Sequence, residues 1–456
     1  MKAMTIQKIA AMTEGEVLCG NPEALAEGIC TDTRKITPGA LFIPIVGENF
    51  DAHAFIPDAL AAGCAASLTS QKDMSADKPL IYVKDTRKSL GKLASAYRQS
   101  FRLPLVAITG SVGKTTAKEM TATVLASACH VLKTQGNFNN DIGLPLTLLQ
   151  LTEKHEAAVI EMGMSGFGEI DLLASIAAPD VVLMTNIGLS HIEMLGSQEN
   201  IYRAKTEFFP HLRPGGTVII NGDDPILSAH KPEMPAKVIS VGTSPEHDIY
   251  ATDIIVKPDS VAFTLVHEDM KKSITLSVPG AHNVTNALLA YAAGFVLNIP
   301  AEQAAHALES YMPGDKRMEF IKNNSLTIIN DCYNAAPASV EAALQVLSMQ
   351  EGRKIAVLGD MKELGEFASS AHKKIGTQAA AFHIDALFTL GENGALIAQG
   401  AKEAGMTEDS VFSFLEIETL QEALSAFIQK GDVILVKASR AMALERITAF
   451  LTEKNK

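Results

Sequence analysis

Residues Leu105-Val-Ala-Ile-Thr-Gly-Ser-Val-Gly-Lys-Thr-Thr116 form an apolar, β-branched run that stops at Gly110, and a helix-compatible segment begins at about Lys114. A strand, a glycine loop and a helix in this order aim free backbone N–H groups and the positive helix end at one point. Lys114 adds charge for the β- and γ-phosphates of a nucleotide, and the Thr115 hydroxyl can reach the accompanying Mg²⁺. The sequence therefore predicts a phosphate loop made of Gly110, Ser111, Val112, Gly113, Lys114, Thr115 and Thr116.

This loop is shorter than the general phosphate-loop pattern. The general pattern requires a glycine five positions before Gly113, and that position holds Ile108. A Gly-Lys-Thr triplet by itself can be an ordinary turn between a strand and a helix. The clean strand before it and the clean helix after it favour nucleotide binding over that alternative.

Length and composition set the class of protein. A chain of 456 residues exceeds one ordinary core and indicates two or three domains. Apolar residues at 47% and charged residues at 20% are typical of a soluble globular protein. The net charge of −13 argues against a nucleic-acid partner, which requires a basic surface.

Cysteine usage and apolar runs bear on the compartment. The five cysteines are odd in number, scattered and without a Cys-x-x-Cys pair, which suggests reduced thiols rather than disulfides or a zinc site. The first ten residues lack the uninterrupted apolar core of a signal peptide. No run reaches the roughly 18 apolar residues of a membrane span. We expect a cytoplasmic enzyme that is not inserted in a membrane and is a monomer.

The chain divides into three α/β regions, at 1–100, 101–312 and 313–456. Alternating strand-like and helix-like segments predict mostly parallel sheets with helices on both faces. We expect a small α/β module, then a mostly parallel sheet that carries the phosphate loop, then a Rossmann-like fold without its own loop. The expected strands are Leu41–Ile45, Leu80–Val83, Leu105–Thr109, Ala157–Glu161, Val181–Asn186, Thr217–Asn221, Leu326–Asn330, Lys354–Leu358, Ala386–Leu390 and Val433–Lys437. Helices are expected around 58–63 and from about residue 283, after a strand-like stretch at 249–278.

Three potentially reactive side chains follow the predicted strands of the central region. Glu161 closes one strand, His191 follows the next, and Lys205 is expected on a helix beyond it. Ligands of parallel sheets bind beyond these strand ends, and a carboxylate, an imidazole and the Thr115 hydroxyl suit one or two Mg²⁺ ions. Each has a plainer interpretation: Glu161 as a helix cap or salt-bridge partner, His191 as a structural residue, and Lys205 as an exposed helix lysine.

Short motifs around these residues resemble the Mur ligase family, in the right order and over essentially the whole chain. The matching motifs are Asn137-Phe-Asn-Asn-Asp-Ile-Gly-Leu-Pro-Leu-Thr147, Glu161-Met-Gly-Met-Ser-Gly-Phe-Gly-Glu-Ile170, Thr185-Asn-Ile-Gly-Leu-Ser-His191, Ala204-Lys-Thr-Glu207, Gly280-Ala-His-Asn-Val-Thr-Asn286, Asp331-Cys-Tyr-Asn334, Leu358-Gly-Asp-Met-Lys-Glu-Leu-Gly365 and Lys437-Ala-Ser-Arg440. The family consists of ATP-dependent amide-forming ligases of cell-wall precursor synthesis. The motifs at 331–334 and 358–365 look most like its last amide-forming member, which joins D-alanyl-D-alanine to a UDP-N-acetylmuramoyl-tripeptide.

The resemblance implies roles for individual residues around ATP. Lys114 would contact the ATP phosphates, and Mg²⁺ would be held by Thr115, Glu161, His191 and a carbamylated Lys205. Taking up CO₂ turns a neutral amine into an anion that can bind the metal. The implied nucleotide contacts elsewhere are Asn283 at the adenine end and Arg317, Asp331 and Asn334 from the third region. Arg317 could instead be a surface salt-bridge residue beside Asp315 and Glu319.

The resemblance also implies substrate contacts. Residues 31–34 and 39–47 resemble the family's UDP-binding module, in which Arg34 can pair bidentately with a diphosphate. Arg34 could equally be a loop arginine beside Asp32, and Arg440 a solvated arginine after a strand. The expected substrate-binding residues are Thr33, Arg34, Asn139, Asn140, Ser165, Lys437 and Arg440.

Rival functions remain open at this point. One is a related ligase that adds the third residue of the peptide, although its Asp-Asn-Pro selector is absent from the sequence. Another extends folate with glutamate, which would leave the first 100 residues without a role. A third is a phosphate-loop ATPase switch, which does not explain the UDP-type first region. A purely structural role fits least.

Overall fold

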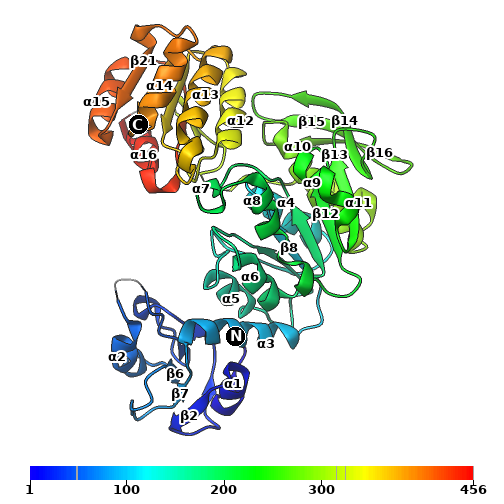
Figure 1. The fold of residues 1–456 in the computed structure, drawn as a ribbon, viewed down its shortest axis with the longest axis vertical. Coiled ribbons are helices and arrows are strands. Elements are labelled where there is room, and N and C mark those ends of the chain that lie inside the picture. The colour runs from blue at the N-terminus through cyan, green and yellow to red at the C-terminus, as the bar shows by residue number, and fades with distance from the viewer. Residues whose placement is uncertain (48–49, 315, 324, 455–456) are drawn as a thin grey trace.

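The structure is a computed structural model that describes residues 1–47, 50–314, 316–323 and 325–454. Three sheets follow one another along the chain, each covered by helices, and they form three bodies along the long axis of the molecule (Figure 1). This layout confirms the predicted three-domain α/β fold. The boundaries at 1–100, 101–312 and 313–456 stay a prediction. No helix among the described residues is long and apolar enough to cross a membrane.

The N-terminal domain contains a five-stranded sheet of order β2-β7-β6-β5-β4, in which only β2 is antiparallel to its neighbour. A short ribbon of β1 and β3 lies beside it. The elements are β1 (Met4–Thr5), α1 (Ile6–Thr13), β2 (Glu16–Cys19), β3 (Leu25–Ala26), β4 (Ile29–Cys30), β5 (Leu41–Phe42), α2 (Ile56–Ala61), β6 (Ala66–Thr69), β7 (Leu80–Tyr82) and α3 (Thr86–Gln99).

Helix α3 joins this domain to the central one. Arg98, near the end of α3, is fully buried, and its guanidinium donates to the backbone oxygens of Phe101 (3.1 Å) and Leu103 (3.0 Å). Asp180 lies 3.5 Å from the same guanidinium and accepts a 2.8 Å hydrogen bond from the Leu105 amide. Since these carbonyls lead into the first strand of the central sheet, Arg98 fixes where that strand starts.

The central sheet has nine strands in the order β16-β15-β14-β13-β12-β11-β8-β10-β9, parallel from β9 to β14 and antiparallel at β15 and β16. Its strands are β8 (Leu105–Thr109), β9 (Val131–Lys133), β10 (Ala157–Glu161), β11 (Val181–Met184), β12 (Thr217–Asn221), β13 (Lys237–Gly242), β14 (Ile249–Val256), β15 (Val261–His267) and β16 (Met270–Leu276). Its helices are α4 (Lys114–Ala126), α5 (Gly143–Leu148), α6 (Glu169–Ala177), α7 (Ile192–Leu195), α8 (Gln198–Lys205), α9 (Pro225–His230), α10 (His282–Val296) and α11 (Ala301–Glu309).

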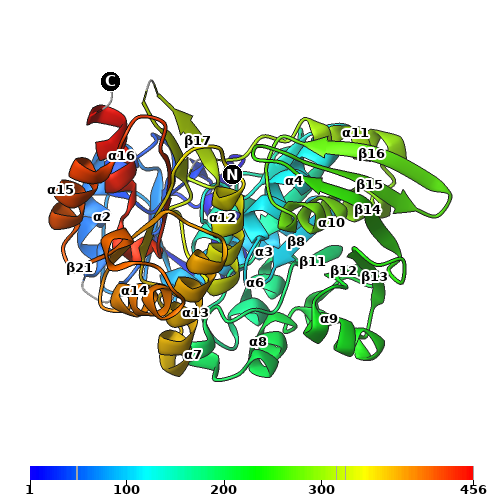
Figure 2. The same ribbon diagram turned by 90° about the horizontal axis from the view of Figure 1, so that it is seen from above.

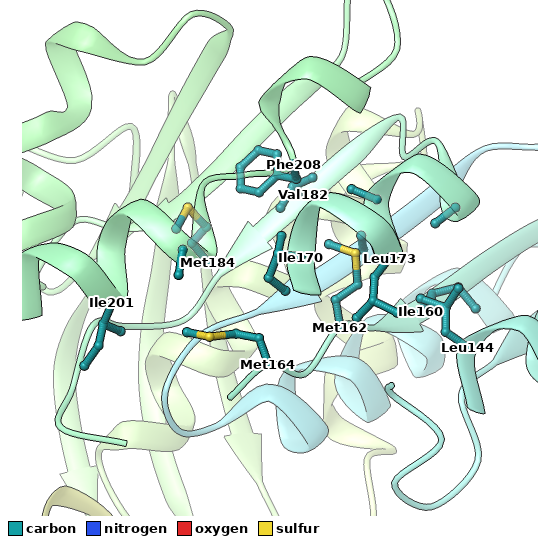
Figure 3. Packing of buried hydrophobic residues seen from close by; sticks show 14 of the residues in the cluster. Leu144, Ile160, Met162, Met164, Ile170, Leu173, Val182, Met184, Ile201 and Phe208 are labelled. Carbon is teal, nitrogen blue, oxygen red and sulfur yellow. The ribbon is translucent and has the colours of Figure 1, made fainter. Parts of the chain in front are cut away.

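Alternation along β10 places Glu161. Ile160 and Met162 pack under α6 in one hydrophobic core, together with Ile170 and Leu173 (Figure 3). Val159 belongs to the core on the opposite face, which contains α4 and α10. Because side chains alternate between the faces of a sheet, Glu161 lies on the Val159 side. The phosphate-loop helix α4 covers this same face of the sheet.

The C-terminal sheet has the order β17-β18-β22-β19-β20-β21 and is parallel except for β17. Its elements are β17 (Glu319–Lys322), β18 (Thr327–Asn330), α12 (Pro337–Ser348), β19 (Lys354–Gly359), α13 (Ala368–Ala381), β20 (Ala386–Leu390), α14 (Gly394–Glu403), β21 (Val411–Phe414), α15 (Ile417–Phe427), β22 (Val433–Lys437) and α16 (Glu445–Lys454). Figure 2 shows this domain beside the central one, and α7 contacts the turn at Gly365–Phe367 that leads into α13.

Most predicted strands occur, with corrections at their ends. The strand expected at 181–186 stops at Met184, because Thr185 and Asn186 turn to bond the phosphate loop. The strand expected at 41–45 has only two residues, and the stretch at 249–278 is a three-stranded antiparallel meander. The expected strands did not include β1 to β4, β6, β9, β13, β17 or β21, of which β9 and β17 are short and partly exposed.

Candidate functional site

The phosphate loop has a backbone that only glycine adopts readily. Gly110 has φ 144° and Gly113, which caps α4, has φ 85°. A Cβ on Gly110 would lie 1.9 Å from the Thr185 Oγ1 atom, and a Cβ on Gly113 would lie 2.9 Å from the Asn286 Oδ1 atom. Both glycines are therefore required by conformation and by close approach.

The turn after β11 holds this loop. The Thr185 hydroxyl donates to the Val112 carbonyl (2.6 Å), as does the Asn186 side-chain amide (3.1 Å). The amide of Gly188 donates to the Ser111 hydroxyl (2.8 Å). The loop is thus fixed before any ligand arrives. Sequence reasoning did not select Thr185 or Asn186, although both lie in the motif at 185–191.

Lys114 folds back over the loop. Its ammonium donates to the carbonyls of Gly110 (2.7 Å) and Ser111 (3.3 Å). Burial lowers the pKa of Lys114, and the nearby Glu161 carboxylate opposes this. The carbonyls keep the amine at the mouth of the loop, where it can turn to a phosphate oxygen.

Thr115 and Glu161 form an oxygen pair at the start of α4. The Thr115 hydroxyl donates to one oxygen of the buried Glu161 carboxylate (2.9 Å), and the Asn139 amide donates to the other (2.8 Å). A hydroxyl and a carboxylate are ligands that suit Mg²⁺. The plainer interpretation of Glu161 as a helix cap or salt-bridge partner fails. Among the described residues its carboxylate pairs with the Thr115 hydroxyl and the Asn139 amide, and its backbone N–H donates to the Thr134 hydroxyl.

Lys205 is not an exposed helix lysine. It ends α8 and is only 1% exposed, and its side-chain amine forms no hydrogen bond or ion pair with any residue that the structure describes. Burial, with repulsion from Lys114, holds the pKa of Lys205 well below its usual range. Its amine is therefore unpartnered among the described residues, and burial disfavours its charged form.

His191 lies at the boundary with the C-terminal domain. It caps α7 with a left-handed backbone (φ 66°), and its Nδ1 atom lies 2.6 Å from the Oε2 atom of Glu363. Contact with His191 lowers the pKa of Glu363. Among the described residues there is no group of three or more His, Cys, Asp or Glu side chains placed to hold a metal ion. Of the predicted metal ligands, the structure joins only Thr115 and Glu161 directly.

Arg317 reaches the site from the C-terminal domain. Its guanidinium donates to the Thr115 hydroxyl (2.9 Å) and lies 4.0 Å from the centre of the Tyr333 ring. The alternative of a surface salt bridge fails for Glu319, which pairs with other groups. Asp315 lies outside the described residues. Arg317 thus brings the second domain to the phosphate loop.

The other predicted nucleotide contacts are held by structural partners. The Lys437 ammonium is buried and lies 2.5 Å from the Asp331 carboxylate and 3.0 Å from the Asn334 carbonyl. Asn283 is buried at the start of α10, where its amide donates to the Pro279 carbonyl (2.7 Å).

Asn286 was missed by sequence reasoning. One turn after Asn283, its side-chain amide donates to the Asn283 oxygen (3.3 Å). Its own Oδ1 occupies the space where a side chain on Gly113 would lie. The Asn-x-x-Asn spacing places both on one helix face, and this was the available signal.

The predicted substrate residues are dispersed. Arg34 is exposed and pairs bidentately with Asp32 at 2.8 Å, which lowers the pKa of Asp32 to about 2. Arg440 is exposed and lies 2.6 Å from Glu445. Thr33 begins the turn at Thr33–Lys35, the Asn140 side chain accepts from the Gly143 amide at the start of α5, and the Ser165 amide donates to Glu169. Asn139 alone touches the Glu161 network.

The fold and site define a phosphate-loop, nucleotide-dependent enzyme in which two domains meet at the loop. Three family models match successive parts of this chain. They are "Mur ligase family, catalytic domain" at residues 26–98, "Mur ligase middle domain" at 108–294, and "Mur ligase, glutamate ligase domain" at 316–440. The chain belongs to the Mur ligase family and is an ATP-dependent ligase that forms amide bonds.

Similar proteins cover the whole chain. The UDP-N-acetylmuramoyl-tripeptide–D-alanyl-D-alanine ligase of Bacillus subtilis (strain 168) is 42% identical over 98% of both chains. The protein of that name from Escherichia coli (strain K12) is 35% identical over 99% of both. A crystal structure of MurF from Acinetobacter baumannii superposes with a TM-score of 0.92, at 32% identity and 99% coverage of each chain. The crystal structure of MurF ligase from Thermotoga maritima in complex with ADP superposes with a TM-score of 0.83. The identity is 27%, and the match covers 94% of this chain and 97% of the Thermotoga chain.

Proposed function

We propose that this chain joins D-alanyl-D-alanine to UDP-N-acetylmuramoyl-tripeptide, with conversion of ATP to ADP and phosphate. The observation that carries the proposal is the hydrogen bond from Arg317 to Thr115, which brings a second domain to a phosphate loop. Two domains around one nucleotide can hold several substrates and exclude water. The choice of substrates is supported by relatives that carry that name over nearly their full length.

The reaction needs no nucleophile from the protein. The terminal carboxylate of the tripeptide attacks the γ-phosphorus of ATP, ADP leaves, and an acyl phosphate forms. The amine of D-alanyl-D-alanine then adds to the acyl carbon, and phosphate leaves as the C–N bond is completed and the amine loses its proton. Lys114, the α4 N-terminus and Arg317 supply positive charge where it accumulates.

The residues present fit Mg²⁺. Thr115 and Glu161 offer a hydroxyl and a carboxylate oxygen 2.9 Å apart, and His191 and Lys205 complete the proposed set. The bound ion would neutralise phosphate charge. The buried, unpartnered amine of Lys205 fits carbamylation, in which the nitrogen bonds CO₂ and releases a proton. Gly110–Thr116, Asn283, Asp331 and Asn334 would bind ATP, and Thr33, Arg34, Asn139, Asn140, Ser165, Lys437 and Arg440 the other substrates.

The test is phosphate release with ATP and Mg²⁺, adding the tripeptide substrate and D-alanyl-D-alanine separately and together. Release that requires both, with a product heavier by the dipeptide, is the expected result. Parallel reactions with L-lysine and diaminopimelate tripeptides identify the third residue. Release without the amine would instead indicate an ATPase. We also propose a cytoplasmic monomer, for which light scattering should give the 48.6 kDa mass.

A further inference from the structure

The motif at 358–365 has no role in the reaction as described so far, yet its loop crosses between two domains. Glu363 lies on this loop of the C-terminal domain, and its Oε2 atom is 2.6 Å from the Nδ1 atom of His191 in the central domain. That nitrogen is buried, and neither Glu363 nor any other described atom is aligned with it for a hydrogen bond. The Glu363 carboxylate nevertheless lies within ion-pair distance of this nitrogen.

The backbone reinforces this contact. The Glu193 amide donates to the Glu363 carbonyl (3.3 Å). A Cβ on Gly365 would lie 3.1 Å from the Glu193 Cα atom, so the loop packs directly on α7. His191 (φ 66°), Glu363 (φ 65°) and Gly365 (φ 50°) all have left-handed backbones. Such a conformation in a non-glycine residue persists where the surroundings fix it.

The rest of the motif holds Glu363 in place. The buried Asp360 carboxylate accepts from the Gly394 amide and from the Lys362 ammonium, both at 2.8 Å. The Met361 amide donates to the His372 ring at 2.9 Å. The Lys362 amide donates to the Ser439 hydroxyl at 2.9 Å. With each residue before it anchored in the C-terminal domain, Glu363 has a fixed position relative to that domain.

We propose that Glu363 is a positioning residue that orients His191 across the domain boundary. A small rotation of the imidazole aligns its Nδ1–H with the Glu363 carboxylate 2.6 Å away, which then accepts it and leaves the Nε2 lone pair free to bind the cation. A histidine that binds a metal ordinarily donates its other ring N–H to such an acceptor. Since Glu363 belongs to the C-terminal domain, His191 is oriented only when the two domains are docked. This inference rests on the proposed role of His191 as a metal ligand.

The test compares Glu363→Ala with Glu366→Ala, which removes an exposed carboxylate three residues away that pairs with no residue the structure describes. One readout is the ¹⁵N spectrum of histidine in the ligand-free protein, with the His191 signals assigned from a His191→Asn variant. The other is Mn²⁺ affinity in the presence of ADP, measured by electron paramagnetic resonance. Glu363→Ala should lose the Nδ1–H form of His191 and bind Mn²⁺ about 10- to 100-fold more weakly.

Glu366→Ala should leave both readouts unchanged. Glu363→Gln keeps an acceptor oxygen and should recover the Nδ1–H form, which separates positioning from a failure to fold. An unchanged tautomer or unchanged Mn²⁺ affinity in Glu363→Ala would overturn the proposal. Neither readout uses the peptide substrates, so either result stands apart from the outcome of the ligase assay.

Discussion

Replacing Gly110 with alanine should destabilise the central domain through one identifiable clash. The new Cβ would lie 1.9 Å from the Thr185 Oγ1 atom, which must then move and give up its 2.6 Å bond to the Val112 carbonyl. A buried hydrogen bond lost in this way costs about 1–3 kcal/mol. The backbone at φ 144° adds about 1–3 kcal/mol of strain. We expect a total loss of about 2–5 kcal/mol in the free energy of unfolding.

Gly168→Ala is the matched control. Gly168 also has a positive φ of 81°, but a Cβ there would meet nothing within 4 Å. It should cost only the backbone strain, about 1–2 kcal/mol. Thr185→Ala removes the clashing oxygen. The double variant Gly110→Ala/Thr185→Ala should therefore lose about 1–2 kcal/mol less unfolding free energy than the sum of the losses in the two single variants.

The assay is urea unfolding followed by circular dichroism. A three-domain chain can unfold in several steps, so the relevant transition is the one that Mg²⁺ and ADP shift to higher urea. Equal losses for Gly110→Ala and Gly168→Ala, or strict additivity with Thr185→Ala, would refute the clash.

Lys114→Ala should lower turnover about 10²- to 10³-fold with an unchanged melting temperature; wild-type turnover would contradict its phosphate role. Lys205→Ala should lose activity and regain part of it with added short carboxylic acids, and full activity without them would remove the carbamate. Burial lowers the pKa of His372 below 6.5, and its neutral ring accepts from the Met361 amide. Below that pH the unfolded chain binds more protons than the folded one, so acid removes stability. Melting temperature should fall more steeply below pH 6.5 in the wild type than in His372→Gln, and parallel curves would contradict this.

Local signals carried the sequence predictions. The phosphate loop could be predicted because its strand, glycines, lysine and helix are consecutive in the sequence. Glu161 could be predicted because it ends an apolar strand. Thr115 and Glu161 do meet, at 2.9 Å. Lys205 had no local signal, since its burial and lack of a partner come from the fold around α8. Its role as a carbamylated metal ligand entered only through the family resemblance.

Contacts between domains were the least predictable part. Arg317 and Thr115 are 202 positions apart in the chain, and nothing near either residue in sequence indicates their hydrogen bond. The same holds for His191 and Glu363, which meet because two loops with left-handed backbones dock. Lys437 was expected to contact substrate, but in the structure it is buried and paired with Asp331. The sequence around Lys437 did not indicate this internal ion pair.

The most direct test of the central claim follows an oxygen atom. The terminal carboxylate of the tripeptide is labelled with ¹⁸O, and the phosphate released during turnover with ATP and D-alanyl-D-alanine is analysed by mass spectrometry. If the carboxylate attacks the γ-phosphorus, each released phosphate carries one ¹⁸O atom. Phosphate with no label would show that water had attacked ATP, and the account of this chain as an acyl-phosphate ligase would be wrong.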